Sequence, residues 1–275
     1  MMIPTETIKN TLFFDIETTT RYKTYEEYLQ NEPHSAKDFE NQIRMKKPYD
    51  GMDISDVYKN EAMLSPEHGQ VVSIGCRIWN KDEKKWDDEI FGFSSWEDYE
   101  SRDKRSADKD ILISFNEVLF GIFGEQIGTL GGYNINSFDI PYLYRRMLSV
   151  GLYPQQTLNL SNKKSWNLHN LELRSWWSEP GANGYSGFSS ACEMMGIGSS
   201  KEEGIDGRQV YYKFWDDNDV DVINRYCMRD VEKSAQFAVS LSEDRLRKRH
   251  EATMEEYRRR MEEKNNQETN NTQEG

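Results

Sequence analysis

Apolar residues recur along this chain at two spacings, one typical of strands and the other of helices. Four short stretches are rich in branched or aromatic residues, and they predict strands over residues 11–17, 71–79, 89–94 and 127–134. The second and third stretches are joined by a charged turn, so they predict an antiparallel hairpin. Gly131 and Gly132 in the fourth strand would let another backbone, or a substrate strand, come close.

Longer stretches with apolar residues at helical spacing predict helices between and after these strands. Residues 20–65 are charged, aromatic and helix-prone, and they predict a helical insertion. The other predicted helices cover residues 110–124, a segment from Asp139, residues 188–196 and a long segment from Asp217. Residues 155–185 are rich in Trp, Asn, Ser and Gly, and they predict an irregular segment.

Length limits the number of domains, and composition sets the last residues apart. A chain of 275 residues is long enough for one large α/β domain, or two small ones, with a hydrophobic core. We expect the folded part to cover residues 1–242. Residues 243–264 are nearly all charged and predict a solvated helical extension. The end of the chain, residues 265–275, predicts a disordered tail.

The chain shows no sequence signal for a membrane or for export. It lacks an apolar run of about 18 residues, which excludes a membrane-spanning helix, and its first residues do not form a secretory signal. The three cysteines are odd in number and widely spaced, which favours reduced thiols and a cytoplasmic location.

The net charge of −13 argues against a polyanionic partner, because most nucleic-acid binders present a basic surface. Part of that charge would lie in acids whose bound Mg²⁺ neutralises them. Short basic clusters remain that could contact phosphates: Arg44 with Lys46 and Lys47, Arg145 with Arg146, Lys163 with Lys164, Lys201, and Arg208. We therefore expect weak, salt-sensitive binding of nucleic acid. Trp166, Trp176 and Trp177 could stack unpaired bases, although burial is the expectation for at least two of them.

Four acidic residues stand in local contexts that suit metal-bound carboxylates. Asp15 and Glu17 lie two apart on the first strand, so their side chains leave the same face. Asp139 opens a helix, where backbone N–H groups favour an anion. Tyr226 and Asp230 are four apart on one face of the long helix. Carboxylates suit Mg²⁺ or Mn²⁺, and two such ions roughly 3.5–4 Å apart can clamp the reacting oxygens of a phosphodiester.

Each of these features has a common structural explanation, since an Asp before a helix usually caps it. Their order along the chain is more specific. The runs FFDIETTT (13–20), GYNINSFDIPYL (132–143) and YCMRD (226–230) resemble the three exonuclease motifs of the DEDD superfamily in its tyrosine-bearing subclass. The closest resemblance is to the 3′–5′ proofreading exonuclease domain of family-B DNA polymerases and its stand-alone relatives, and it covers roughly residues 8–242.

The resemblance implies an α/β, ribonuclease H-like fold, in which helices flank both sides of a five-stranded mixed sheet. It implies that Asp15 bridges two Mg²⁺ or Mn²⁺ ions and that Glu17 and Asp230 complete the site of the nucleophilic water. Asp139 would serve the second ion, and Tyr226 would orient the attacking hydroxide.

The same resemblance implies three further contacts near the substrate. Thr18 would touch the 3′-terminal nucleotide through its main chain, Asn134 would hold the backbone or the substrate strand, and Phe138 would pack under the site. The insertion is longer than the connection found in the family, and it could form a lid or a partner surface. Residues 166–177 match the family poorly, so no role is carried over to His169.

The predicted function is therefore a metal-dependent 3′–5′ exonuclease that shortens single-stranded DNA ends and releases nucleoside monophosphates. It would work in repair, replication or a phage-type process, with a possible replication or repair protein as partner. An exoribonuclease stays open, because the metal site is indifferent to the sugar. A non-catalytic nucleic-acid-binding module is the alternative from another class, and the presence of all four acids and Tyr226 argues against it.

Overall fold

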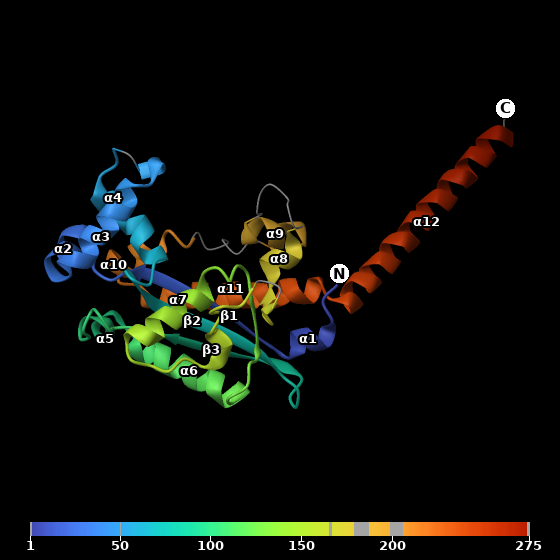
Figure 1. Ribbon diagram of the computed structural model, residues 1–275. Helices are drawn as coiled ribbons and strands as arrows, with labels where there is room; N and C mark the ends of the chain where they lie inside the picture. Colours follow the sequence, from blue (N-terminus) through green and yellow to red (C-terminus); the bar gives the residue numbers. More distant parts are fainter. Residues whose placement is uncertain (1, 50, 165–166, 179–186, 199–205, 274–275) are drawn as a thin grey trace.

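A five-stranded mixed sheet forms the centre of the molecule (Figure 1). The computed structural model describes residues 2–49, 51–164, 167–178, 187–198 and 206–273. The strands are β1 (Thr11–Thr20), β2 (Gly69–Asn80), β3 (Lys85–Gly92), β4 (Thr129–Gly132) and β5 (Leu171–Glu172). Their order across the sheet is β3-β2-β1-β4-β5. The pairs β1–β2 and β2–β3 are antiparallel, and β4 and β5 run parallel to β1. This is the predicted ribonuclease H-like sheet.

Helices cover both faces of the sheet. The longer ones are α6 (Lys109–Phe123) and α7 (Asp139–Ser149) on one face and α11 (Val220–Ser240) on the other (Figure 1). The shorter ones are α1 (Thr5–Lys9), α5 (Trp96–Glu100), α8 (Leu173–Trp177), α9 (Phe188–Met194) and α10 (Val210–Trp215). Among the described residues, no helix is both long enough and apolar enough to cross a bilayer.

The alternation of side chains along β1 separates two hydrophobic cores. Leu12, Phe14 and Ile16 belong to the larger core, which α6 and α7 cover. Phe13 belongs to the smaller core, together with residues of α11. Asp15 and Glu17 share the strand face of Phe13, so both acids emerge beneath α11.

Three segments differ from the prediction because their structure depends on distant contacts. β3 begins at Lys85 rather than at residue 89, since Trp86 pairs with Trp79 and meets Phe13 edge-on. Residues 155–185 are not irregular throughout, because they contain a 3₁₀ turn (Gln156–Leu158), β5 and α8. The sequence did not predict α10, which buries four of its six residues.

The insertion is a small helical layer at one end of the sheet (Figure 1). It contains α2 (Tyr25–Asn31), α3 (Pro33–Arg44) and α4 (Ile54–Glu61), with 3₁₀ turns at Lys47–Tyr49 and Ala62–Leu64. Its own core is aromatic, and Tyr28 stacks on both Tyr22 and Tyr58. Arg21, just after β1, forms a nearly buried ion pair of 2.7 Å with Glu32. This pair fixes the insertion to the end of β1.

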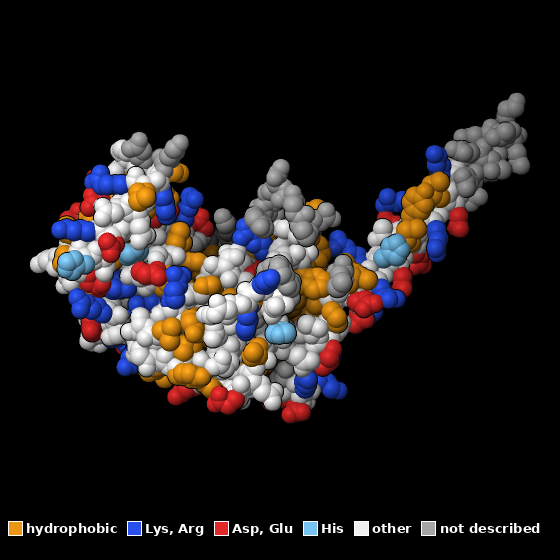
Figure 2. All heavy atoms as spheres, in the orientation of Figure 1, with side chains coloured by type: hydrophobic (Ala, Val, Ile, Leu, Met, Phe, Trp, Pro, Cys, Tyr) orange, Lys and Arg blue, Asp and Glu red, His pale blue; other side chains and the backbone are white. Residues whose placement is uncertain are grey.

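α12 (Glu243–Gln273) projects from the domain as a single helix with many charged side chains (Figures 1 and 2). It starts next to the N-terminal segment, where Ile3 and Ser242 form an isolated bridge. The helix covers residues 243–264, where a helical extension was predicted, and it continues to Gln273. No glycine or proline interrupts this stretch. Residues 274–275 lie outside the described residues.

Candidate active site

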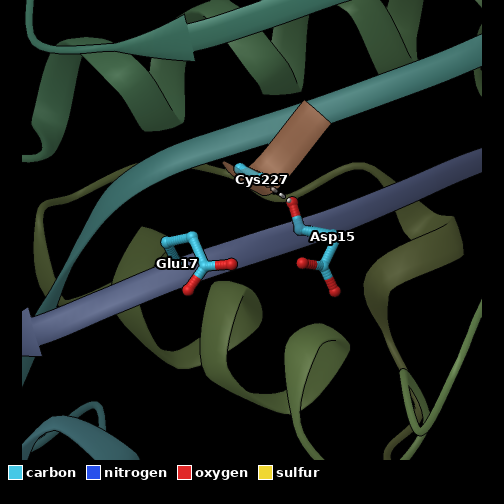
Figure 3. Close-up of side chains that lie close together, drawn as sticks. All are labelled: Asp15, Glu17 and Cys227. Atoms are coloured by element: carbon cyan, nitrogen blue, oxygen red, sulfur yellow. Dashed lines mark hydrogen bonds between the residues drawn. The ribbon is translucent and has the colours of Figure 1, made fainter. Parts of the chain in front are cut away.

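Asp15 and Glu17 are presented by an irregular part of β1. Asp15 pairs with Gly75 of β2 and Glu17 pairs with Ser73, and a bulge follows between Glu17 and Thr18. Both carboxylates leave the same side of the strand (Figure 3). Asp15 is half-buried, whereas Glu17 is only 7% exposed. A rigid strand therefore holds two acids at a fixed separation.

α11 brings Tyr226 and Asp230 to the same place. The helix starts at Val220, and the side chain of the preceding residue Asp219 caps it by accepting a hydrogen bond from Val222 N. Burial raises the pKa of Tyr226 far above its usual value, and so do the charges of nearby Glu17, Asp230 and Asp15. Tyr226 therefore stays protonated and can act as a hydrogen-bond donor.

Cys227 lies beside both acids of β1, which the sequence did not indicate. Potential ligand atoms of Asp15, Glu17 and Cys227 all lie within 4.8 Å of one another (Figure 3). The thiol is engaged with main chain, however: its Sγ accepts from Gly75 N at 3.1 Å and donates to Asp15 O at 3.4 Å. Burial and the two neighbouring carboxylates raise the pKa of Cys227 well above its usual value, so it stays neutral. We therefore regard Cys227 as a link between α11 and the sheet, and the carboxylates as the metal donors.

Asp139 reaches the cluster from the start of α7, where the sequence placed it. Its Oδ1 accepts a hydrogen bond of 3.2 Å from Ile16 N, between the two acids of β1. Burial raises the pKa of Asp139 to about 7, although the N–H groups of Asp139 and Ile16 act in the other direction.

The four carboxylates form one cluster of like charge. Burial raises the pKa of Asp15 well above its usual value, and the charges of Asp139, Glu17 and Asp230 add to the shift. The pKa of Glu17 is raised by burial and by Asp230 and Asp139. All the charges that shift these two pKa values are negative, so the ionised cluster is costly without a cation. Buried oxygen donors of this kind fit hard divalent ions such as Mg²⁺ or Mn²⁺.

The cluster borders a cleft of about 930 Å³ beside the insertion, where the surface is hollowed (Figure 2). The domain contributes Glu17, Thr18, Phe138, Arg208 and Tyr226 to this cleft. The insertion supplies its facing wall, which includes Tyr49, Met52, Asp56, Asn60, Glu61 and Leu64. Thr18 and Phe138 thus line the cleft next to the cluster.

Asn134 lies in a different, smaller cleft and is engaged by the protein itself. Its backbone has a φ of 72°, and its side-chain oxygen accepts from Arg174 at 2.5 Å. Of the two expected roles for Asn134, holding the backbone or holding substrate, these contacts favour the first. Gly132 also serves internal packing, since a Cβ there would lie 2.5 Å from Ile135.

Glu172 is a residue near the site that the sequence analysis missed. It stands on β5, is 8% exposed, and accepts from Asn134 N at 2.7 Å and from Asn136 N at 2.9 Å. Its charge also helps to raise the pKa of Asp139. Glu172 therefore shapes the loop that leads into Asp139. The only available signal was an acid between two leucines, in a segment predicted to be irregular.

Several residues that were predicted to contact phosphates or bases instead form ion pairs or pack within the protein. Arg146 is only 2% exposed and pairs with buried Asp108 at 2.6 Å, because the inner face of α7 carries it into the core. Arg145 pairs with Glu67 at 2.9 Å on the surface. Trp177 packs on Phe237, with ring centroids 5.4 Å apart. Trp166 and Lys201 lie outside the described residues.

The fold and the carboxylate cluster together define a ribonuclease H-like protein of the 3′–5′ exonuclease class. A family model described as a predicted 3′–5′ exonuclease related to the exonuclease domain of PolB matches residues 67–273, so the chain belongs to this family. The matched segment contains Asp139, Tyr226 and Asp230, and it begins after the strand that carries Asp15 and Glu17. A comparison with curated proteins gives no match.

Proposed function

We propose that this protein removes nucleotides from the 3′ end of single-stranded DNA by metal-dependent hydrolysis, releasing nucleoside monophosphates. The convergence of four carboxylates from three distant segments of the chain is the observation that carries this proposal. Asp15 would bridge two Mg²⁺ or Mn²⁺ ions, Glu17 and Asp230 would complete one site, and Asp139 would serve the other. When bound, such ions polarise the phosphate and favour a hydroxide nucleophile at neutral pH.

Tyr226 positions the attacking water in this proposal. Its hydroxyl is held protonated by burial and by the surrounding carboxylates. It lines the cleft next to Glu17, so a water between this hydroxyl and the carboxylates is oriented by a donor on one side and by acceptors on the other. Correct placement of a nucleophile is a large contribution to catalysis in hydrolytic sites.

The composition of the cleft supports an unpaired strand as the substrate. Met52 and Leu64 on the insertion wall are 54% and 49% exposed, and they offer apolar surface to bases. Asp56 and Glu61 on the same wall would repel phosphates. Arg208 gives the cleft a cation. Bases would therefore face the insertion and phosphates would face Arg208 and the metal ions.

The direct experiment follows the shortening of 5′-labelled oligonucleotides with Mg²⁺ or Mn²⁺. We expect single-stranded DNA to be degraded from its 3′ end by the wild-type protein, and Asp15→Asn and Asp230→Asn to be inactive. A wild-type protein that binds DNA but shortens it with neither metal would instead be a binding module. If both variants remained active, a contaminating nuclease would be the source. Faster degradation of RNA than of DNA would favour the exoribonuclease alternative.

A further inference from the structure

A second cleft, of about 670 Å³, lies at the far end of α11 from the active site. It is formed by the last turns of α11, the first turns of α12, the segment after α9 and the adjacent strands β2 and β3. Its α11 residues Gln236, Val239 and Ser240 lie about 9 to 15 Å along the helix from Asp230. The cleft is therefore separate from the carboxylate cluster.

Every charged residue that lines this second cleft is a cation. Arg245, Lys248 and Arg249 come from α12, and Arg77 comes from β2. Arg77 is paired, because it contacts Asp88 at 2.6 Å and Glu232 at 3.1 Å. The three α12 cations are exposed and form no ion pair with any described residue. A concentration of positive charge in a chain of net charge −13 marks this place for an acidic ligand.

The floor of the second cleft is mainly aliphatic. Ala235 and Val239 of α11 and Met195 and Ile197 after α9 line it, and Val239 is 40% exposed. Such a floor suits an inserted apolar side chain, whose burial stabilises a complex by about 25 cal/mol for each Å² removed from water.

The aromatic ring in this cleft is poorly placed to stack a nucleic-acid base. Arg77 already lies over the Trp86 ring at 5.9 Å. Phe13 and Trp79 meet the same ring edge-on, at centroid distances of 6.0 and 5.4 Å. Single-stranded nucleic acids gain much of their affinity by stacking on open rings. The cleft therefore fits an acidic peptide better than a nucleic-acid strand.

We propose that this cleft docks an acidic peptide segment of a partner protein, with one large apolar side chain on the aliphatic floor and carboxylates against Arg245, Lys248 and Arg249. The rest of this acidic molecule repels such a segment, so the local cations also determine where it binds. This interaction does not depend on the carboxylate cluster or on hydrolysis.

Fluorescence anisotropy with the full chain in EDTA tests the proposal. The probe is a short fluorescein-labelled peptide of Asp and Gly with two central Phe residues. We expect the combined change Arg245→Glu, Lys248→Glu and Arg249→Glu to weaken binding about tenfold or more. The matched control is Arg258→Glu, Arg259→Glu and Arg260→Glu, which makes the same charge change farther along α12. It should alter affinity by less than about threefold.

Two further changes test the role of the aliphatic floor. Val239→Ser, or a peptide with Ala in place of Phe, should also weaken binding. Equal losses in the two charge-reversed proteins would show only general electrostatic attraction and would overturn the proposal. A cleft variant that lost affinity for a labelled oligonucleotide but not for the peptide would assign the surface to nucleic acid. Concentration-dependent dimers abolished by the cleft changes would assign it to a second copy of the chain.

Discussion

At the scale of single residues, the active site destabilises the folded protein, because its like-charged carboxylates lie close together and are partly buried. The pKa values of Asp15, Glu17 and Asp139 are all raised by burial. Bound divalent cations would offset this repulsion. Side chains that are unfavourable to folding by themselves are a sign of a functional site.

Replacing Tyr226 by Phe tests whether the phenol positions the nucleophile. The change removes one hydroxyl from a well-packed side chain, so the fold and the carboxylates should remain. We expect the turnover number to fall by roughly 10²–10⁴-fold, with nearly unchanged metal affinity. Single-turnover rates and a metal titration measure the two quantities. An unchanged rate would show that another group orients the water.

The pH dependence of stability should report the buried carboxylates. The pKa of Asp139 is about 7 in the folded protein and 3.8 ordinarily, so its favourable contribution is complete below about pH 3.8 and is lost as the pH rises through 7. In EDTA, the urea concentration at the unfolding midpoint of the wild-type protein should therefore decrease as the pH rises from 5 to 8. The midpoint of Asp139→Asn should decrease less over the same range. Identical pH profiles for the two proteins would show that Asp139 does not titrate as described.

At the scale of elements, the close approach of α11 to the sheet determines where Tyr226 and Asp230 lie. A Cβ on Gly75 would lie 3.1 Å from Val231 Cγ2 and 3.4 Å from Cys227 Sγ. We expect Gly75→Ala to displace α11, to cost about 1–3 kcal/mol of stability and to lower activity. Adding Val231→Ala to this variant should restore part of the lost stability and part of the lost activity.

Gly121→Ala is the matched control for this prediction, because a Cβ there meets no atom within 4 Å. Its position on the exposed side of α6 should make the change neutral or slightly stabilising. Chemical denaturation and oligonucleotide degradation measure both effects. If Gly75→Ala behaved like Gly121→Ala, the packing of α11 would not control the site.

Local patterns account for the parts of the fold and site that the sequence predicted. Asp15 and Glu17 lie on one face because side chains two residues apart on a strand point the same way. Tyr226 and Asp230 lie on one face because side chains four residues apart on a helix do so. β5 could not be predicted, because a strand of two residues shows no alternation. The same holds for Glu172, whose hydrogen bonds reach Asn134 and Asn136 across the sheet. The burial of Arg146 could not be predicted either, because it depends on an ion pair with Asp108, which is distant in the sequence.

At the scale of the whole molecule, the insertion completes the active-site cleft. It was predicted as a helical segment of open role, and the structure makes it one wall of the cleft that contains Glu17 and Tyr226. Its aromatic core and the pair Arg21–Glu32 fix it to β1. The wall is therefore built into the domain.

Removing the apolar side chains of this wall should weaken substrate binding. We expect Met52→Ser with Leu64→Ser to raise the KM for a single-stranded oligonucleotide several-fold, with little change in kcat. Base contacts of this kind are worth about 1–3 kcal/mol each when they include stacking, and less for aliphatic groups. Met45→Ser is the control, since Met45 is 86% exposed and does not line the cleft. Equal KM values for the two variants would contradict a base-binding wall.

Thermal unfolding with and without Mg²⁺ or Mn²⁺ tests the central claim, that the four carboxylates form one binding site for divalent cations. Saturating metal should raise the wild-type Tm by about 5 to 10 °C. In EDTA, Asp15→Asn and Asp230→Asn should unfold at a higher temperature than the wild type, and added metal should shift them little. Glu125→Gln, a change at an exposed acid, should respond like the wild type. A wild-type Tm that neither metal changes, or equal shifts in all four proteins, would contradict the account.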